Sequence, residues 1–182
     1  TDFNDTEIGI KAIKLLCALG YHVEIPKHCE SGRTFLSKGL VRKAKKIANK
    51  NISLLKDVIT FDTPLIGIEP SGILTFRDEY INLADKNNKD AAGSLALSSF
   101  MIDEFLVDEF EKGNFNKDIF TDKKIHIKLH GHCHQKSLAS TGPTKEMLSI
   151  PQNYSVEEIK SGCCGMAGSF GFETEHYELS MK

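Results

Sequence analysis

Hydrophobic residues recur every three or four positions in several stretches of the chain, and this spacing predicts amphipathic helices. In the first stretch Asp5 or Thr6 can cap the helix, and Gly20 follows its last turn. Cys17 lies in this helix, and we expect its side chain in the core. The pattern predicts helices at residues 5–19, 37–55, 73–83, 94–111 and 143–149, and from residue 173 onward.

Short apolar or alternating runs between these helices predict β-strands. Residues 65–68 carry no charge and fit a buried strand, whereas residues 125–129 alternate between apolar and polar side chains. Further strands are expected at residues 21–25 and 156–159. Because strands alternate with helices, the expected fold class is α/β and Rossmann-like, with a mainly parallel sheet flanked by helices.

A weak internal repeat divides the chain. Tyr21, Val23 and Glu24 match Tyr154, Val156 and Glu157 at an offset of 133 positions. A polar break at residues 86–90 lies between the two copies. We therefore expect two pseudo-repeated lobes, residues 1–88 and 89–182. Each copy has strand-end turns, and the repeat places one turn of each copy outside the chain, so we expect a segment cut from a longer protein at both ends.

Composition excludes some functions and leaves others open. The 182 residues are 40% hydrophobic and carry a net charge of −2, which gives no reason to expect nucleic-acid binding. No apolar run is long enough to span a bilayer, and no signal-peptide pattern is present. We expect a cytoplasmic protein, with peripheral association at the inner membrane left open. The basic run Arg42, Lys43, Lys45 and Lys46 is interpreted as a solvated helix face, with a docking patch as the alternative.

Five cysteines and no secretory signal favour reduced thiols or metal ligation over a disulfide framework. Cys163 and Cys164 are adjacent, and a disulfide between neighbours would strain the peptide that joins them. The glycines at 162 and 165 let a bulky ligand approach the main chain. The two thiols therefore suit a metal or a metal–sulfur cluster, although small buried side chains in a tight turn are the alternative.

A second cysteine-bearing turn lies upstream, after the expected strand at residues 125–129. Here Cys133 stands between His132 and His134, with His130 nearby. The histidines could ligate a metal, or their N–H groups could donate hydrogen bonds to cluster sulfurs. In parallel sheets ligands gather at the carboxyl ends of strands, and both cysteine-bearing turns follow strands.

The segments HCHQK at residues 132–136 and GCCGMAGSFG at residues 162–171 resemble the cysteine-rich, or CCG, domain family. That family includes the cysteine-rich subunit of heterodisulfide reductase and the iron–sulfur subunits of glycolate and glycerol-3-phosphate dehydrogenases. The best match is to the carboxyl-terminal region of large FAD-linked oxidases that act on D-2-hydroxy acids. Weaker matches to that group are SGR, SKG, EPS and FRDEY, which begin at residues 31, 37, 69 and 76.

The resemblance implies an iron–sulfur cluster of the 4Fe–4S type, or zinc in some members. The ligands that it implies in this chain are Cys133, Cys163 and Cys164, with Cys29, His132 and His134 as additional ligands or supporting groups. A later ligand turn of the family has no counterpart among the 182 residues. The first copy departs from the family pattern, because Glu30 and Ser31 replace its cysteine pair and Gly72 stands where members often have cysteine. The isolated segment is therefore expected to hold an empty or partly occupied site.

The function that the resemblance implies is electron relay. FAD in another part of the polypeptide would oxidise a 2-hydroxy acid of the D-lactate or glycolate type, and the cluster would pass electrons to an unidentified acceptor. No catalytic residue is expected in this segment, and its partner is the flavin domain of the same polypeptide. The main alternative is a structural or docking module, with or without zinc. Thiol catalysis at Cys163 or Cys164 is a third reading.

Overall fold

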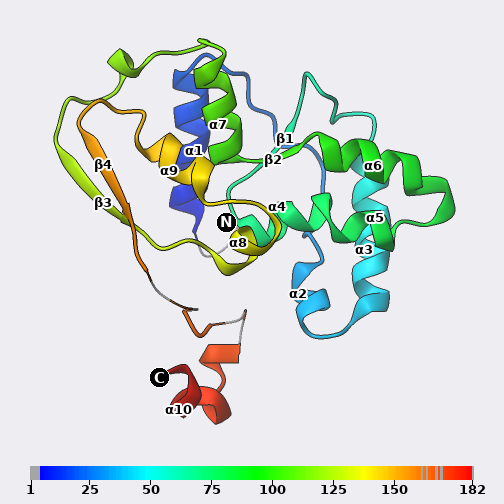
Figure 1. Ribbon diagram of the computed structural model, residues 1–182. Helices are drawn as coiled ribbons and strands as arrows, with labels where there is room; N and C mark the ends of the chain where they lie inside the picture. Colours follow the sequence, from blue (N-terminus) through cyan, green and yellow to red (C-terminus); the bar gives the residue numbers. More distant parts are fainter. Residues whose placement is uncertain (1–4, 161, 163, 167, 169, 182) are drawn as a thin grey trace.

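The computed structural model describes residues 5–160, 162, 164–166, 168 and 170–181. Two separate two-stranded parallel sheets are flanked by helices (Figure 1). Strand β1 (Leu65–Gly67) pairs with β2 (Ser99–Met101), and β3 (Ile125–Leu129) pairs with β4 (Tyr154–Glu158). The expected α/β class with parallel strands is therefore confirmed. The helices have the following bounds: α1 Thr6–Ala18, α2 Arg33–Ser37, α3 Val41–Leu55, α4 Pro70–Arg77, α5 Glu79–Leu83, α6 Lys89–Leu97, α7 Ile102–Glu111, α8 Cys133–Leu138, α9 Gly142–Leu148 and α10 Tyr177–Ser180, with short 3-10 turns at Lys86–Asn88, Lys117–Ile119, Phe170–Phe172 and Thr174–His176.

Two of the expected elements are wrong. Residues 21–25 form no strand, because Tyr21 and Val23 pack as single side chains against a helix cluster instead of joining a sheet. The long helix expected at residues 94–111 is interrupted by β2. The reason is pairing with β1, whose Leu65 N–H donates to the Ser98 carbonyl oxygen at 2.8 Å. Tertiary pairing overrides the local helical pattern at this point.

The predicted burial of Cys17 is also wrong. Helix α1 directs Leu15, Leu16 and Leu19 into a hydrophobic cluster, and Leu16 is its buried residue. Cys17 follows Leu16 by one position, about 100° around the helix, and its side chain is exposed. By contrast, the basic run at the start of α3 is solvated as expected, since its four charged side chains are exposed.

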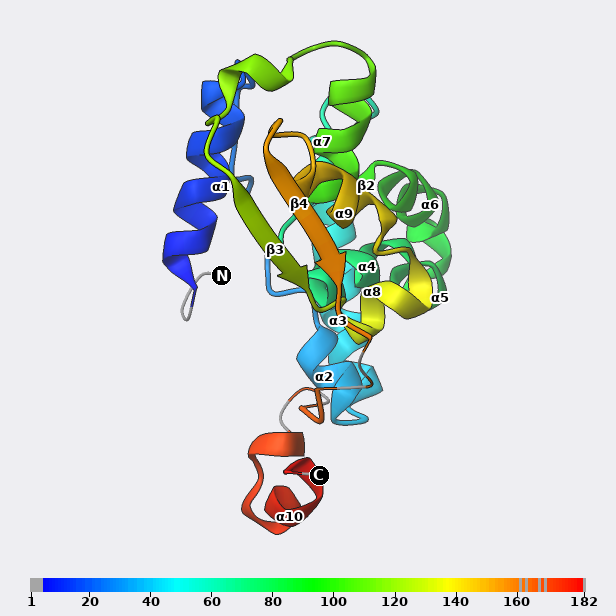
Figure 2. The ribbon, with the colours of Figure 1, turned by 60° about the vertical axis from the view of Figure 1, so that its left-hand side comes forward.

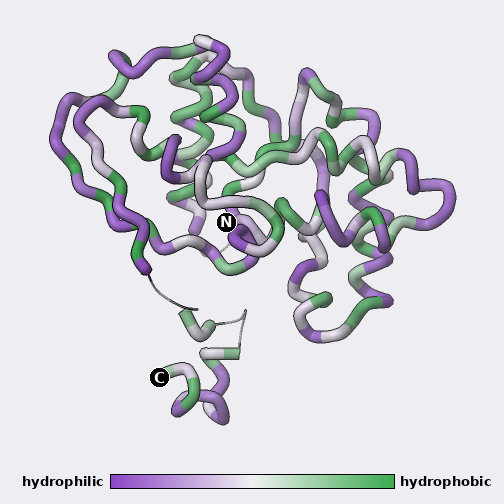
Figure 3. Tube along the Cα trace, in the orientation of Figure 1, coloured by the Kyte–Doolittle hydropathy of each residue, from purple (hydrophilic) through white to green (hydrophobic). Residues whose placement is uncertain are grey.

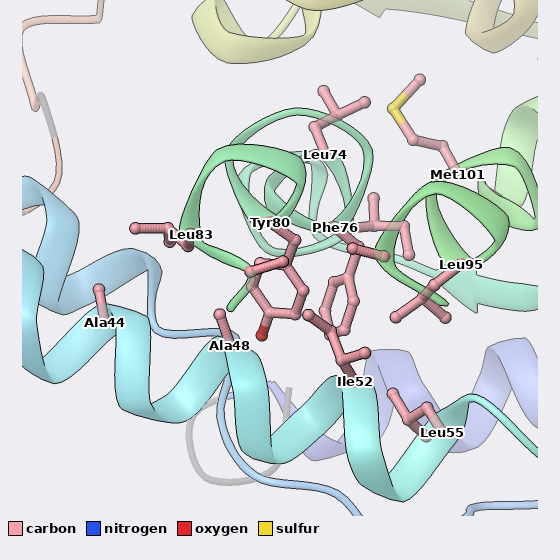
Figure 4. Packing of buried hydrophobic residues seen from close by; sticks show 13 residues of the cluster. Ala44, Ala48, Ile52, Leu55, Leu74, Phe76, Tyr80, Leu83, Leu95 and Met101 are labelled. Carbon is pink, nitrogen blue, oxygen red and sulfur yellow. The ribbon is translucent and has the colours of Figure 1, made fainter. Parts of the chain in front are cut away.

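The larger hydrophobic core joins α3 to α4, α5 and α6 (Figure 4). Ala44 and Ala48 are fully buried on α3, and their small side chains let the neighbouring helices approach closely. The Tyr80 ring lies near Ala48 and the Phe76 ring near Ile52 of α3 (Figure 4), with the two ring centroids 4.3 Å apart. The core residues are Ala44, Ala48, Ile52, Leu55, Ile73, Leu74, Phe76, Tyr80, Leu83, Ala84, Ala92, Leu95 and Met101.

A second core joins the amino-terminal helix α1 to α7. Its buried members are Leu16, Leu106, Phe115 and Ile150. Tyr21 packs edge-on against Phe105, with ring centroids 5.2 Å apart. Both cores thus contain side chains from before and after residue 88, and the division into lobes at residues 88 and 89 stays a prediction.

Strands β3 and β4 lie beside this second core, and hydrophilic and hydrophobic residues alternate along them (Figure 3). After β4 the chain leads to α10, which lies apart from both cores in two views (Figures 1 and 2). An ion pair between Lys38 Nζ and Glu173 Oε1, 2.7 Å long, ties this segment to the loop between α2 and α3. No helix in the described part of the chain is long and apolar enough to cross a bilayer.

Candidate functional site

Both cysteine-bearing segments leave the same end of the same small sheet. Strands β3 and β4 are parallel, and their last residues, Leu129 and Glu158, are paired. The Ile159 N–H still donates to the Leu129 carbonyl oxygen at 2.8 Å, so the two strands leave the sheet side by side. Cys133 follows β3 by four residues, and the Cys163–Cys164 pair follows β4 by five. The sheet therefore starts both segments from one place, as the sequence predicted for strand-end turns.

Cys133 opens helix α8, and its side chain is exposed. His132 is the N-terminal cap, because its Nδ1 accepts a hydrogen bond from the His134 N–H at 3.2 Å. An acceptor Nδ1 leaves the ring proton of a neutral His132 on Nε2. His132 thus supports the Cys133 backbone, and its Nε2–H is the group left to donate elsewhere.

His134 lies where this turn meets the first copy, because α8 packs against α4. Burial and the positive charge of Arg33 lower the pKa of His134, while the carboxylates of Glu79 and Glu69 act in the opposite direction. The Nε2 atom of His134 and the Oε2 atom of Glu79 are buried and make no hydrogen bond within the described residues. Both atoms are therefore available to a bound water or ligand.

The first-copy turn at residues 29–31 is held by two fully buried side chains, Asn51 and Tyr80. Asn51 Oδ1 accepts from the Cys29 N–H at 2.7 Å, and its Nδ2 donates to the Glu30 carbonyl at 2.9 Å. The Tyr80 hydroxyl accepts from Asn51 Nδ2 at 2.8 Å and donates to the Ser31 carbonyl at 2.9 Å. Burial raises the pKa of Tyr80, so the hydroxyl stays protonated as this donor.

The other first-copy turn lies beside it. Glu69 caps α4 by accepting from the Ser71 and Gly72 N–H groups at 2.9 and 2.6 Å. A Cβ atom at Gly72 would lie 3.9 Å from Ser31 Oγ and 3.0 Å from Glu69 Oε2. Ser31 and Gly72, which stand where the resembling family has cysteines, are therefore neighbours in space. The Cys29 side chain is half-buried at the start of the turn at residues 29–31.

The FRDEY segment, residues 76–80, supplies contacts that sequence reasoning left without a role. Arg77 Nη1 donates to both carboxylate oxygens of Glu104, at 2.8 and 2.6 Å, and this ion pair joins α4 to α7. Glu79 pairs with Arg33, and Tyr80 holds the turn at residues 29–31. The sequence predicted only a helix at residues 73–83, and nothing in its pattern identifies these long-range partners.

The glycine-rich segment near the carboxyl end is only partly described. Cys163 lies outside the described residues, and the Cys164 side chain is exposed. Gly165 has a φ of +78°, which favours glycine, and a Cβ atom there would lie 3.3 Å from the Ser180 carbonyl oxygen of α10. The Gly171 N–H donates to the Met166 carbonyl at 2.9 Å and closes the turn.

Whether the side chains of this region fit a metal depends on the adjacent thiols of Cys163 and Cys164. Within residues 5–181, leaving out the undescribed positions, no three His, Cys, Asp or Glu side chains lie close enough to hold an ion. The donor types nevertheless suit a soft metal or an iron–sulfur cluster, because Cys133 and Cys164 are exposed thiols on segments that leave one sheet end. The ligand set of Cys133, Cys163 and Cys164, with Cys29, His132 and His134 as further candidates, stays a prediction.

The chain is similar over nearly its full length to parts of larger dehydrogenases. It is 25% identical over 185 residues to D-2-hydroxyglutarate dehydrogenase of Haemophilus influenzae, a match to 99% of this chain and 17% of that protein. It is 26% identical over 183 residues to one subunit of the anaerobic glycerol-3-phosphate dehydrogenase of Escherichia coli K12, a match to 98% of this chain and 44% of that subunit. The chain thus spans less than half the length of either relative.

A third relative, D-2-hydroxyglutarate dehydrogenase of Pantoea ananatis, is 25% identical over 183 residues, with 17% of its length matched. No family model matches the chain, and no solved structure matches it. The names of these relatives agree with the oxidoreductase part of the expectation. Assignment to the CCG family, the cluster and the electron relay stay predictions.

Proposed function

We propose that this chain is the cluster-binding, electron-relay part of a larger FAD-linked oxidoreductase. The observation that carries the proposal is the parallel pairing of β3 with β4, which starts the Cys133 and Cys163–Cys164 segments from one end of a sheet. Similarity to segments of dehydrogenases supports it. A bound iron–sulfur cluster would supply one-electron transfer between the flavin and an acceptor.

In this proposal the thiolates of Cys133, Cys163 and Cys164 hold the cluster. His132 orients the turn through its cap on His134 N–H, and its Nε2–H can donate to a cluster sulfur. His134 Nε2 is buried without a hydrogen bond in the described residues, so it can order a water or a further group between the two copies. Cys29 lies in a turn that hydrogen bonds with Asn51 and Tyr80 already hold.

The substrate class follows from the relatives and stays part of the proposal. Two of the relatives are named for D-2-hydroxyglutarate and one for glycerol-3-phosphate. Each compound carries a secondary alcohol that a dehydrogenase oxidises to a carbonyl. We therefore propose a 2-hydroxy acid as the substrate of the flavin site in the rest of the polypeptide.

A structural zinc module is the second candidate. The observation that favours it is the first copy, where hydrogen-bonding side chains hold the turn at residues 29–31 and Glu30 and Ser31 replace a cysteine pair. If the first copy is folded without cysteine ligands, the second copy could serve only to assemble the domain with its partner and carry no electrons. Zinc bound by cysteines would then stabilise the fold without redox chemistry.

Metal analysis of the full-length protein, purified without oxygen, tests the proposal. We expect iron and acid-labile sulfide in roughly equal amounts, and a visible absorption that is bleached when substrate is added. Cys133→Ser should lose most of the iron, because a hydroxyl is a poor ligand for this type of centre. Cys17→Ser is the matched control, since Cys17 is an exposed cysteine on α1, and it should keep all of the iron.

The opposite results would decide against relay. Zinc alone, with normal assembly lost in Cys133→Ser, would support the structural module. Iron that remains after both Cys133→Ser and Cys163→Ser would contradict the proposed ligand set. Iron that is present but is not reduced by substrate would contradict electron transfer from the flavin.

A further inference from the structure

A buried polar cluster lies beneath the helix that begins at Cys133. Gln135 is 5% exposed and Asp103 is 6% exposed. The Gln135 Nε2 atom lies within hydrogen-bonding distance of three acceptors, Asp103 Oδ2 at 3.1 Å, Thr144 Oγ1 at 2.7 Å and the Ser140 carbonyl oxygen at 3.0 Å. The Thr144 hydroxyl also donates to Asp103 Oδ2. These contacts join α8 to α7 and to α9.

These contacts hold helix α8 from one side, in addition to its packing against α4. It has six residues, too few for a stable helix by itself, and Gln135 is its buried residue. An ionised carboxylate only accepts hydrogen bonds, so Asp103 fixes which end of the Gln135 amide faces it. Asp103 is held in turn, because its Oδ1 accepts from the Glu104 N–H at 2.9 Å in the first turn of α7.

The chain is also fixed on the other side of Cys133. Gly131 is buried, and a Cβ atom there would lie 2.5 Å from Thr141 Cγ2. Residues 131 and 135 are thus both packed against the segment at residues 140–144. Cys133 lies midway between them and is exposed. The thiol is held out from a short helix whose two anchors lie two residues away on either side.

From this arrangement we infer that Gln135 and Asp103 are positioning residues that set the direction of the Cys133 thiol. The role of the Cys133 thiol as a metal ligand rests on the proposed function. The position of this thiol does not depend on the proposed function. The carboxylate and amide form a fixed polar pair. Its loss should release α8 and change the access to Cys133 without changing Cys133 itself.

The test compares three variants of the full-length, metal-free protein. Gln135→Glu places a second carboxylate against Asp103 and should break the pair. The double variant Gln135→Glu with Asp103→Asn exchanges the two groups, so that the new amide at position 103 can donate to the new carboxylate at position 135. This restores the contact between the two positions, whereas the Ser140 carbonyl oxygen keeps no donor from position 135. Ser137→Ala changes an exposed side chain of the same helix and is the control.

Two readouts report on the thiol and on its helix. The first is the rate of iodoacetamide alkylation of Cys133 relative to Cys17, resolved by peptide mass spectrometry; Cys17 is exposed on α1 and serves as the internal standard. The second is hydrogen exchange of the Lys136 and Ala139 amides, which are bonded within α8. In Gln135→Glu we expect about tenfold faster exchange in α8 and a clear change in the alkylation ratio, as for loss of one or two buried hydrogen bonds.

The double variant, in which the amide and the carboxylate exchange positions, is the decisive comparison. Restoration of both readouts in the double variant supports positioning, even where Gln135→Glu unfolds as a whole. An unchanged alkylation ratio in Gln135→Glu, or a folded double variant whose ratio is no nearer to wild type than that of Gln135→Glu, would overturn the inference. Absence of iron and sulfide from the wild-type protein would overturn the proposed function instead and would leave the behaviour of α8 unaffected.

Discussion

At the scale of single residues, Glu109 is a buried carboxylate with three hydrogen-bond donors. Tyr21 donates to its Oε2 at 2.6 Å and Asn114 Nδ2 at 2.7 Å, while Lys112 Nζ donates to Oε1 at 3.1 Å. Burial acts to raise the pKa of Glu109, but these donors outweigh it and the pKa is lowered from its usual 4.5. Burial and the same hydrogen bond raise the pKa of Tyr21. The ionised carboxylate therefore stabilises the contact between the chain after α1 and helix α7.

The consequence is a defined loss of stability in acid. Because the pKa of Glu109 is lower in the folded state, its contribution is present above pH 4.5 and is lost as the pH falls through the folded-state pKa. Glu109→Gln should lower the free energy of unfolding by about 1–2 kcal/mol near neutral pH, and the difference from wild type should shrink in acid. Guanidinium unfolding of both proteins across this range measures it, and a difference independent of pH would contradict the assignment.

At the scale of elements, a glycine in β1 tests how closely this strand approaches α4, and a glycine in α6 serves as the comparison. A Cβ atom at Gly67, the last residue of β1, would overlap the Ile73 side chain of α4. Gly67→Ala should therefore destabilise the protein by about 1–3 kcal/mol. Gly93, inside α6, has no other group within 4 Å of such a Cβ atom, so Gly93→Ala should stabilise it by about 0.5–1 kcal/mol. A urea midpoint for Gly67→Ala that equals or exceeds that of wild type would show that the approach of Ile73 to Gly67 is not limiting.

Elements with a strong local pattern were predictable, and those that depend on distant partners were not. Strand β3 has the predicted bounds, and α1 differs from its prediction by one residue at each end, because their patterns are regular. Strand β2 was hidden inside a helical pattern, since only its pairing with β1 makes it extended. Helices α2 and α8 were not predicted, because each is too short for its periodicity to be recognised.

The candidate site divides in the same way. That Cys133 and the Cys163–Cys164 segment each follow a strand could be predicted, because each strand has its own pattern, whereas the pairing of the two strands is seen only in the structure. The supports of Cys133 could not be predicted. Gln135 and Asp103 lie 32 positions apart, and only Asp103 is in a predicted helix, so nothing in the sequence joins them before the fold brings their side chains together.

At the scale of the whole molecule, the packing predicts how the chain folds when it is divided at residue 88. Residues 1–88 alone would lack Ala92, Leu95 and Met101 of the larger core. Residues 89–182 alone would lack Leu16 of the smaller core. Neither residues 1–88 nor residues 89–182 alone should show a cooperative thermal transition, whereas the mixed halves should regain one. Circular dichroism measures this. Cooperative unfolding of each separate half would instead support two independent lobes.

The partnership of α1 with α7 also has a consequence for synthesis. About 80 residues separate the end of α1 from the start of α7, and a ribosome adding about 5–20 residues per second needs about 4–16 s to make them. During that interval the cluster that Leu15, Leu16 and Leu19 enter lacks its α7 side chains. The apolar face of α1 therefore waits for its α7 partners while they are translated. A slower codon stretch before α7 would lengthen the time for which chaperones have to cover it.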